Sequence, residues 1–574
     1  MARLTARLTE ARLTRPRRGR NIARAVSIRV LRRCALLALA LSACQARDTG
    51  VPTTGRAGGT VVFAAPATGE PLFPPVVNSN ATLEIVDQLF ESLAKLDGVN
   101  PIGDTHMVPV LADKWQWSPD SLSIAFHIDP HARWHDGVPV TATDVRYSFR
   151  TYTDTVVGAA SATYLTAIDS VTAPDSATAV FWFKHRYPYQ FYDAAAIMYI
   201  VPAHLLATIA PTDLRAAPFG HHPVGTGRFR FVSWTPGQEL TLTADTANYH
   251  GRPLLDNLVW LVAPDPQTAM VKLYAGDADV YEVVPPDARA DVASHRALRL
   301  KPYTDGTYGF LGFNLRRPLF ATRPLRRALT MGLDRHAMLR NVFDTLGRIP
   351  PGPVVHWHFL ADTTLRQLPY DTTAAGRTLD SLGWRRGPDG MRRNGGRPLT
   401  FSILVPTSSK IRMRYAVLIQ EQLHGLGVTA TVDAVEFGAY LQRLASHQFD
   451  AFLNTWALDP SPGAIKETWT SSAIPTGFNY SAYSNPVFDA LVDSGTTSAD
   501  LPRVRAYFSR AFQVINDDAP GAWLYEPGLV AAVNARVHSG PLPAQHWWLD
   551  LADWSIPAAQ RIPRDRIGVQ PPPH

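Results

Sequence analysis

Apolar and polar residues alternate in several short stretches of the chain. Between residues 122 and 128 every second residue is apolar, and the same period recurs at 179–183 and at 240–242. Successive side chains of a β-strand point to opposite faces, so this pattern predicts strands with one buried face. Apolar residues recur every three to four positions at 83–93 and 415–426, which predicts helices there.

Local signals place further element ends. Thr141 and Asp144 have the spacing of a capping box and predict a helix that begins there and runs through Arg150. Strand and helix patterns mix along the whole chain, and no repeat with a period of 20–50 residues is visible. The 574 residues are enough for three or four domains or lobes. We therefore expect a mixed α/β (α+β) protein with several interleaved lobes.

Composition limits the function classes. Hydrophobic residues make up 46% of the chain and charged residues 18%, which excludes global disorder. The net charge of +7 comes from the N-terminus, because residues 1–44 hold 11 of the 56 basic residues and one of the 49 acidic ones. The remaining 45 basic and 48 acidic residues offer no broad surface for a nucleic acid. The protein is therefore not expected to bind nucleic acid.

The N-terminus has the pattern of an export signal. Arginines up to Arg33 precede an apolar run of about eight residues, too short to span a membrane. The final four residues, LSAC, resemble a bacterial lipobox, which predicts a signal peptide over 1–43, a lipidated Cys44, and a tether over 44–57. The expected location is the extracytoplasmic face of the cell envelope. An ordinary secretory signal with a chance cysteine is the alternative.

The remaining chain shows no catalytic signature. Cys34 and Cys44 are the only cysteines, so a disulfide framework or a thiolate zinc site after residue 44 is excluded. Nucleotide-binding, hydrolase and zinc-protease motifs are missing, and Gly225-Thr226-Gly227 predicts only a turn between strands. Histidines at 131, 135, 356 and 358 are possible metal ligands, but loop or core positions are the simpler interpretation. We expect no cofactor, no bound metal and no enzymatic activity.

Five blocks of sequence, in order, resemble the family 5 extracellular solute-binding proteins, the dipeptide, oligopeptide and nickel receptors of ABC importers. The resemblance extends from about Gly58 to Ile556, and two positions depart from the family pattern. Arg228 stands where the family usually has proline, and a second acidic residue is missing around Pro460. The blocks are 109–145, 225–253, 312–335, 449–489 and 519–525.

The resemblance implies a periplasmic-binding-protein clamp of the large peptide-binding type, with two lobes that close over a ligand. Lobe I would combine three segments, with an extra subdomain inserted, and hinge strands would join it to lobe II. The expected boundaries are 58–98, 218–305 and 522–560 for lobe I, 99–217 for the extra subdomain, and 306–521 for lobe II.

The resemblance also implies ligand contacts. Asp459 would hold the α-ammonium group of a peptide, although an Asp before Pro460 is also typical of a turn. Trp456 is expected either at the floor of the pocket or in the core. The other aromatic residues expected to line the cleft are Phe73, Tyr308, Tyr480 and Tyr525.

The leading hypothesis is a monomeric, lipid-anchored protein that delivers peptides or peptide-like solutes to an ABC permease. A receptor for nickel or a metallophore on the same scaffold is the main alternative. An envelope hydrolase, or a signalling or chaperone-like receptor, are further alternatives.

Overall fold

The computed structural model describes residues 57–66, 70–475, 477–543 and 546–566. All of them belong to one compact unit, Arg56–His574. The predicted signal peptide, the lipidation site Cys44 and the tether up to residue 56 lie outside the described residues. Within the described ranges, no helix combines the length and apolar character that a membrane span requires.

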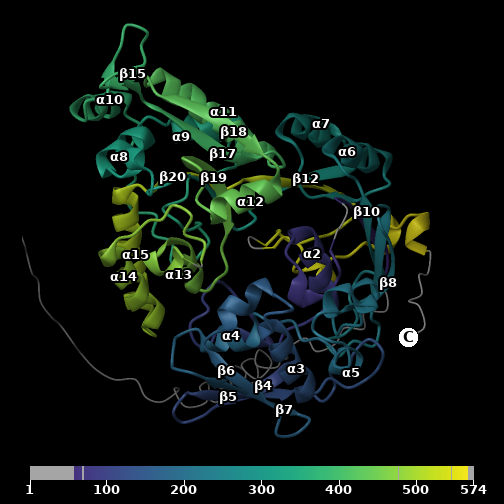
Figure 1. The fold of residues 1–574 in the computed structure, drawn as a ribbon. Coiled ribbons are helices and arrows are strands. Elements are labelled where there is room, and N and C mark those ends of the chain that lie inside the picture. Colours follow the sequence, from purple (N-terminus) through teal and green to yellow (C-terminus); the bar gives the residue numbers. More distant parts are fainter. Residues whose placement is uncertain (1–56, 67–69, 476, 544–545, 567–574) are drawn as a thin grey trace, which may run out of the picture. The chain divides into compact units, whose positions relative to one another are not determined.

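A seven-stranded sheet is built from segments far apart in the sequence (Figure 1). Its order is β12-β21-β11-β1-β10-β9-β8, with β1 parallel to both neighbours and the other pairs antiparallel. The strands are β1 (Thr60–Ala65), β8 (Phe229–Thr235), β9 (Glu239–Ala244), β10 (Asn257–Val262), β11 (Val280–Tyr281), β12 (Leu298–Tyr303) and β21 (Leu529–Asn534). Helix α2 (Asn80–Leu89) packs its apolar face into the core beneath this sheet.

A second sheet has the order β18-β17-β19-β13-β20 and is covered on both faces. Along β13, Leu311 and Phe313 join one core, while Tyr308 and Phe310 join the other. A strand buried on both faces carries apolar residues or glycine on both, which explains the run from Tyr308 to Phe313. The strands are β13 (Thr307–Phe313), β17 (Thr400–Pro406), β18 (Thr429–Val435), β19 (Ala451–Ala457) and β20 (Gly521–Tyr525).

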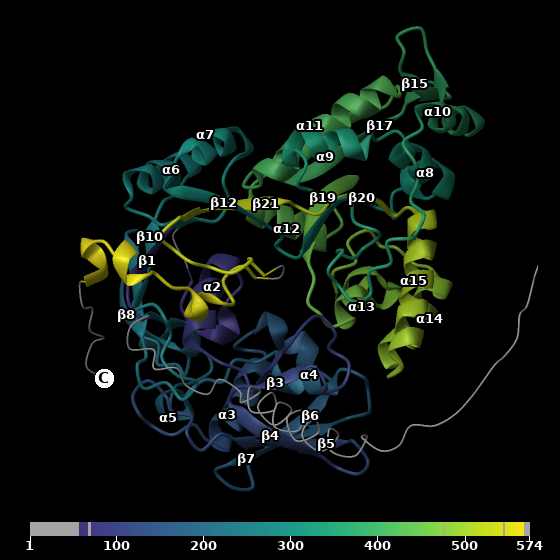
Figure 2. The same cartoon turned by 180° about the vertical axis from the view of Figure 1, so that it is seen from behind.

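Helices cover the two faces of this second sheet separately, as Figures 1 and 2 show. One face packs against α8 (Arg323–Met331), α9 (Arg335–Phe343), α10 (Thr372–Ser381) and α11 (Lys410–Gly425). The other packs against α12 (Phe437–Ala445), α13 (Gly463–Trp469), α14 (Pro486–Thr497) and α15 (Leu501–Asp518). The helix predicted at 415–426 is confirmed as part of α11.

A third unit is the four-stranded sheet β4-β5-β7-β6, packed against α3 and α4. The strands predicted at 122–128 and 179–183 are confirmed as β5 and β7, and the strand at 240–242 as part of β9. The capping box is also confirmed, because the Asp144 carboxylate accepts hydrogen bonds from the N–H and hydroxyl of Thr141. The elements are β4 (Ala112–Trp117), β5 (Ser123–Ile128), β6 (Ile168–Thr172), β7 (Thr178–Phe183), α3 (Ala142–Thr153) and α4 (Gln190–Ala195).

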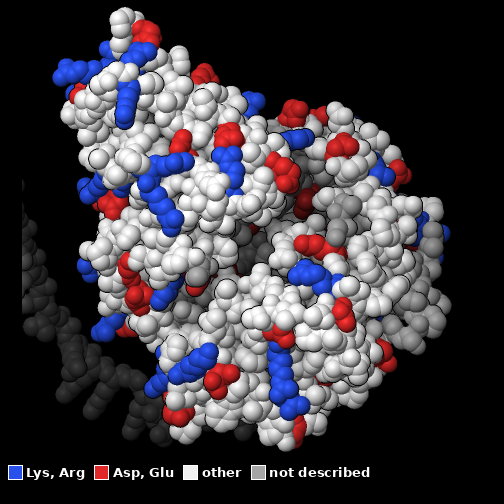
Figure 3. All heavy atoms as spheres, in the orientation of Figure 1, with Lys and Arg blue, Asp and Glu red and all other residues white. Residues whose placement is uncertain are grey.

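The remaining α-helices and β-strands of the described residues lie outside these three sheets and their covering helices. They are β2 (Ala94–Leu96), β3 (Met107–Pro109), α5 (Ala203–Leu206), α6 (Pro266–Ala275), α7 (Arg289–Ser294), β14 (Arg385–Arg386), β15 (Arg392–Asn394) and β16 (Arg397–Pro398). The predicted mixed α/β class is confirmed. On the surface seen in Figure 3, basic and acidic side chains are interspersed over most of the face.

The chain crosses between the two large sheets at residues 304–306 and 526–528, directly from β12 to β13 and from β20 to β21. Strand β20 pairs with β13 and so belongs to the second sheet. The chain enters the seven-stranded sheet only after Tyr525, whereas the sequence predicted that lobe I resumes at residue 522. The grouping of segments into two lobes and a subdomain stays a prediction.

The helix predicted over 83–93 ends earlier than expected, at Leu89. Phe90 is extended, and both Phe90 and Leu93 remain buried without being helical. The last carbonyl groups of a helix lack partners inside the helix. Here the N–H groups of Thr226 and Gly227 donate to the Leu89 carbonyl at 3.0 and 2.9 Å. The Gly225-Thr226-Gly227 motif therefore caps the C-terminal end of α2. Its backbone approaches the backbone of Leu89 so closely that only glycine fits, which the turn alone would not require.

Replacing Gly225 with alanine is expected to destabilise the protein by about 1–3 kcal/mol, because the new Cβ overlaps backbone atoms. An ideal Cβ at Gly225 lies 1.8 Å from the Leu89 carbonyl oxygen. A Cβ at Gly540 meets no atom within 4 Å, so Gly540→Ala is the matched control. Urea unfolding of both variants measures the effect, and equal midpoints would contradict it.

Candidate functional site

Asp459 lies two residues beyond the end of β19, and each of its carboxylate oxygens has a different partner. Oδ1 accepts a hydrogen bond from the backbone N–H of Ser461 at 2.8 Å, which makes the turn typical of an Asp before Pro460. Oδ2 accepts a hydrogen bond from the Tyr192 hydroxyl at 3.1 Å. Tyr192 belongs to α4, which packs on the four-stranded sheet. The Asp459 side chain thus fixes the turn that follows β19 and also contacts the unit of the four-stranded sheet.

Burial changes the protonation of this carboxyl group. It raises the pKa of Asp459 to about 6, although the hydrogen bonds from Ser461 and Tyr192 lower it in part. Asp193, next to Tyr192, is buried, and burial raises its pKa well above the usual value, with the charge of Asp459 adding to the effect. A carboxyl group in low dielectric gains most from a neighbouring cation. The arrangement therefore suits a positively charged group close to Asp459.

Aromatic rings lie at the same end of β19. The Trp456 ring stacks on Tyr480 with centroids 5.9 Å apart, and Phe478 lies 5.6 Å from Trp456. Trp456 and Tyr480 are half-buried, whereas Phe478 is exposed. We call Trp456, Phe478 and Tyr480 the aromatic cluster. It presents an apolar surface three residues from Asp459 along the chain.

Three of the predicted cleft residues are core residues here. Tyr308 has no exposed surface, and its hydroxyl accepts a hydrogen bond from the Trp469 indole N–H at 3.0 Å. Phe73 packs edge-on against Phe219. Tyr525 stacks on the Tyr415 ring. The structure thus stacks Trp456 and Tyr480 at the end of β19 that leads to Asp459, but it does not bring Phe73, Tyr308 or Tyr525 to an exposed surface. Their part in ligand binding stays a prediction.

The candidate metal histidines are engaged by the protein itself. His358 Nδ1 accepts the Leu360 N–H, and Nε2 faces the Asp459 carbonyl at 3.2 Å. Burial lowers the pKa of His358 to about 4, so the neutral ring fixes the backbone of Asp459. His135 bonds the backbone of Gly225 and Gly227 through its two nitrogens. The described part of the chain contains no group of three or more side chains suited to a metal.

Comparison with known proteins gives the family. The model of the bacterial extracellular solute-binding proteins, family 5, matches residues 106–474. The chain belongs to this family. The members of this family are extracellular solute-binding proteins, so the location of this chain is extracytoplasmic.

Individual relatives agree with this assignment. The oligopeptide-binding protein AppA of Bacillus subtilis is 28% identical over 510 residues, which cover 86% of this chain and 92% of AppA. Protein XP55 of Streptomyces lividans is 30% identical over 397 residues, covering 69% of this chain and 71% of XP55.

Solved structures share the fold of this family 5 protein. AppA of Bacillus subtilis, solved in complex with a nonapeptide, superposes with a TM-score of 0.75 at 24% identity, covering 88% of this chain and 99% of that one. NikZ of Campylobacter jejuni, solved with Ni(L-His), gives 0.74 at 21% identity, covering 88% and 100%. The predicted periplasmic-binding-protein fold of the large peptide-binding type is therefore confirmed.

The residues at the two positions that depart from the family pattern make hydrogen bonds within the protein. Arg228 extends to Asp553 and to the Arg252 carbonyl, both at 3.2 Å. Ser461 supplies the N–H that fixes Asp459. Tyr192 and Asp193 were missed in the sequence analysis. The aromatic run from Tyr187 to Tyr192 was the available signal, but nothing in it indicates contact with residue 459.

Proposed function

We propose that this protein captures peptides or peptide-like solutes and that Asp459 binds the ligand's α-ammonium group. The observation that carries the proposal is the Asp459 carboxylate, which is partly buried and accepts a hydrogen bond from a hydroxyl group of a different structural unit. An ammonium group would replace the Tyr192 hydroxyl as the donor to Oδ2. Charge-assisted hydrogen bonds are about twice as strong as neutral ones, so this exchange favours the ligand.

The aromatic cluster supports a peptide as the ligand. Its rings, two of them half-buried and one exposed, offer apolar contact area at the end of β19 that leads to Asp459. A large apolar wall with few fixed polar groups is typical of small-molecule sites. The two direct crossings between the large sheets, at 304–306 and 526–528, are three residues long. A closure over a ligand would therefore need only these few residues to change conformation as a hinge.

The further parts of the proposal concern partners and location. The protein hands its ligand to an ABC permease, acts as a monomer, carries out no covalent chemistry and needs no cofactor. Lipid on Cys44 anchors it to the membrane, supported by the sequence LSAC at residues 41–44. Stable anchoring needs more than one acyl chain, and a processed lipobox cysteine is expected to carry at least two.

Mass spectrometry of small molecules that co-purify with the untagged mature protein tests the proposal. Peptides are the expected ligands, and synthetic copies of them should bind in calorimetry with one site per protein. Recovery of only non-peptide solutes would contradict peptide capture, and so would recovered peptides whose synthetic copies give no binding heat.

Peptide affinity should depend on pH through Asp459. Its pKa of about 6 means that the carboxyl group is mostly ionised at pH 7 and mostly neutral at pH 5. A neutral carboxyl group does not attract an ammonium group, so affinity should fall by about tenfold from pH 7 to pH 5. Calorimetry across this range measures the change. A constant or rising affinity on acidification would count against the Asp459 assignment.

A further inference from the structure

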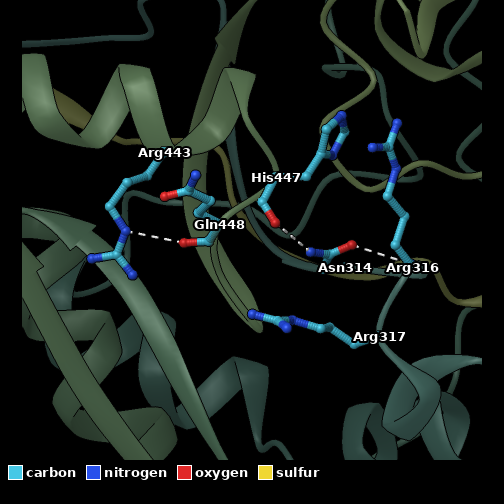
Figure 4. A pocket seen from close by; sticks show the side chains of 6 residues that line it. All are labelled: Asn314, Arg316, Arg317, Arg443, His447 and Gln448. Carbon is cyan, nitrogen blue, oxygen red and sulfur yellow. Dashed lines mark hydrogen bonds between the residues drawn. The ribbon is translucent and has the colours of Figure 1, made fainter.

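A polar cavity of about 410 Å³ lies at the opposite end of β19 from Asp459. In the β13–β19 pair, Phe313 is opposite Ala451, and Thr307 is opposite Ala457. Six residues at about 3.3 Å each separate these two ends by about 20 Å. The cavity is therefore separate from Asp459, and it meets the aromatic cluster only through the backbone carbonyl of Tyr480. Figure 4 shows the residues that line it, which are Asn314, Arg316, Arg317, Arg443, His447 and Gln448.

Two of its arginines are held in fixed positions by the protein. Arg317 Nε donates to the Phe449 carbonyl at 3.1 Å and lies 3.2 Å from an Asp450 oxygen. Arg443 Nε donates to the Gln448 carbonyl at 3.0 Å, and its Nη2 pairs with Asp433 at 2.6 Å. These bonds leave further N–H groups on each guanidinium, because arginine carries five donors.

Hydrogen bonds hold the wall between these arginines in place. The Asn314 amide is buried and donates to the carbonyls of His447 and Phe449, at 3.1 and 2.9 Å. His447 has a left-handed backbone with a φ of 52°. Its Nδ1 faces the Tyr480 carbonyl at 3.0 Å and must carry a proton there, which leaves Nε2 for the cavity.

Arg316 is different from the other two arginines. Its side chain is exposed and makes no hydrogen bond or ion pair with any of the residues that the structure describes. In Figure 4 it extends beside the imidazole of His447. Burial lowers the pKa of His447, and the charge of Arg316 lowers it further. Of the three arginines that line the cavity, Arg317 pairs with Asp450 and Arg443 with Asp433, so the charge of Arg316 leaves the cavity with a net positive charge.

We propose that this cavity is an anion site that binds a phosphate group, with Arg316 as its main ligand. A planar guanidinium matches two phosphate oxygens at once, and such bidentate pairs are both strong and specific. The volume lies in the usual range for small-molecule sites. The phosphate group belongs either to a free phosphate ion or to the headgroup of a lipid. The site acts independently of the proposed peptide capture.

Calorimetry with inorganic phosphate and with soluble dihexanoyl phosphatidylglycerol tests the site on the full mature protein. Arg316→Gln is expected to weaken binding by about tenfold or more, because it removes the charge and the paired donors. Arg503→Gln is the matched control, since Arg503 is an exposed arginine at the start of α15 whose carboxylate partner is three residues away. Thermal unfolding checks that both variants are folded.

The two probes distinguish a free phosphate ion from a lipid headgroup as the ligand. Arg316-dependent binding of inorganic phosphate supports the site with a free ion as a sufficient ligand. Arg316-dependent binding of the lipid alone supports it with a headgroup as the ligand. Absence of binding by both probes at millimolar concentration overturns the proposal, and so does binding that Arg316→Gln leaves unchanged.

Discussion

Replacing Asp459 with asparagine is expected to weaken peptide binding by about a hundredfold. Asparagine keeps an oxygen that can accept the Ser461 N–H, so the turn before Pro460 should persist. What disappears is the negative charge that faces the ligand's ammonium group. Removing one partner of a buried, hydrogen-bonded charge pair costs about 2–5 kcal/mol, which is about thirtyfold or more in affinity. Calorimetry with the peptides that co-purify measures the loss.

An acetylated peptide separates this charge pair from other effects. N-acetylation removes the ammonium charge, so it should weaken binding to the wild-type protein but hardly affect binding to Asp459→Asn. Asp493→Asn is the control, because Asp493 pairs with Lys466 on an exposed surface. Equal losses on acetylation in wild type and Asp459→Asn would show that Asp459 does not hold the ammonium group.

The sequence predicted Asp459 but not its surroundings. The turn role and the ligand role were both open, and the structure shows that the two oxygens allow the turn to form while Oδ2 faces Tyr192. Residues 192 and 459 are 267 positions apart. No local pattern reports a contact over such a separation, because it depends on how the separate units pack.

Aromatic residues show the same limit. Tyr308 and Tyr480 were indistinguishable as candidates, yet one is fully buried and the other half-exposed. Tyr308 lies on β13, a strand covered on both faces, whereas Tyr480 lies in the segment that connects α13 to α14. Residue type and period do not reveal whether a second layer covers a strand.

Elements fixed by local physics were more predictable. The two-residue period of β5 and the capping box of α3 both involve neighbours within a few positions, and both are confirmed. The end of α2 was placed too late, since its apolar period continues to residue 93. Leu89 ends the helix because a distant segment, Thr226-Gly227, caps its carbonyl. Tertiary contacts of this kind override the local pattern.

A buried charge network holds the first strand to the C-terminal segment. The Asp279 carboxylate has no exposed surface and accepts hydrogen bonds from Arg536 Nε and Nη2 at 2.8 and 2.9 Å, and from Arg564 at 2.5 Å. It also accepts the backbone N–H of Val62 in β1 at 3.0 Å. Arg536 in turn pairs with Asp565 at 2.6 Å. One side chain therefore satisfies donors from β1 and from the segment after β21.

Replacing Asp279 with alanine should destabilise the protein by about 3–5 kcal/mol, because it leaves buried guanidinium donors without their partner. Asp277→Ala is the matched control: Asp277 is exposed two positions away, so its loss should change stability by less than about 0.5 kcal/mol. Urea unfolding followed by tryptophan fluorescence measures both. Trp547, Trp548 and Trp554 lie in the core of the seven-stranded sheet, so unfolding of the unit that the network ties together contributes to this signal. Equal midpoints for the two variants would mean that hydrophobic packing alone holds the C-terminal segment to this sheet.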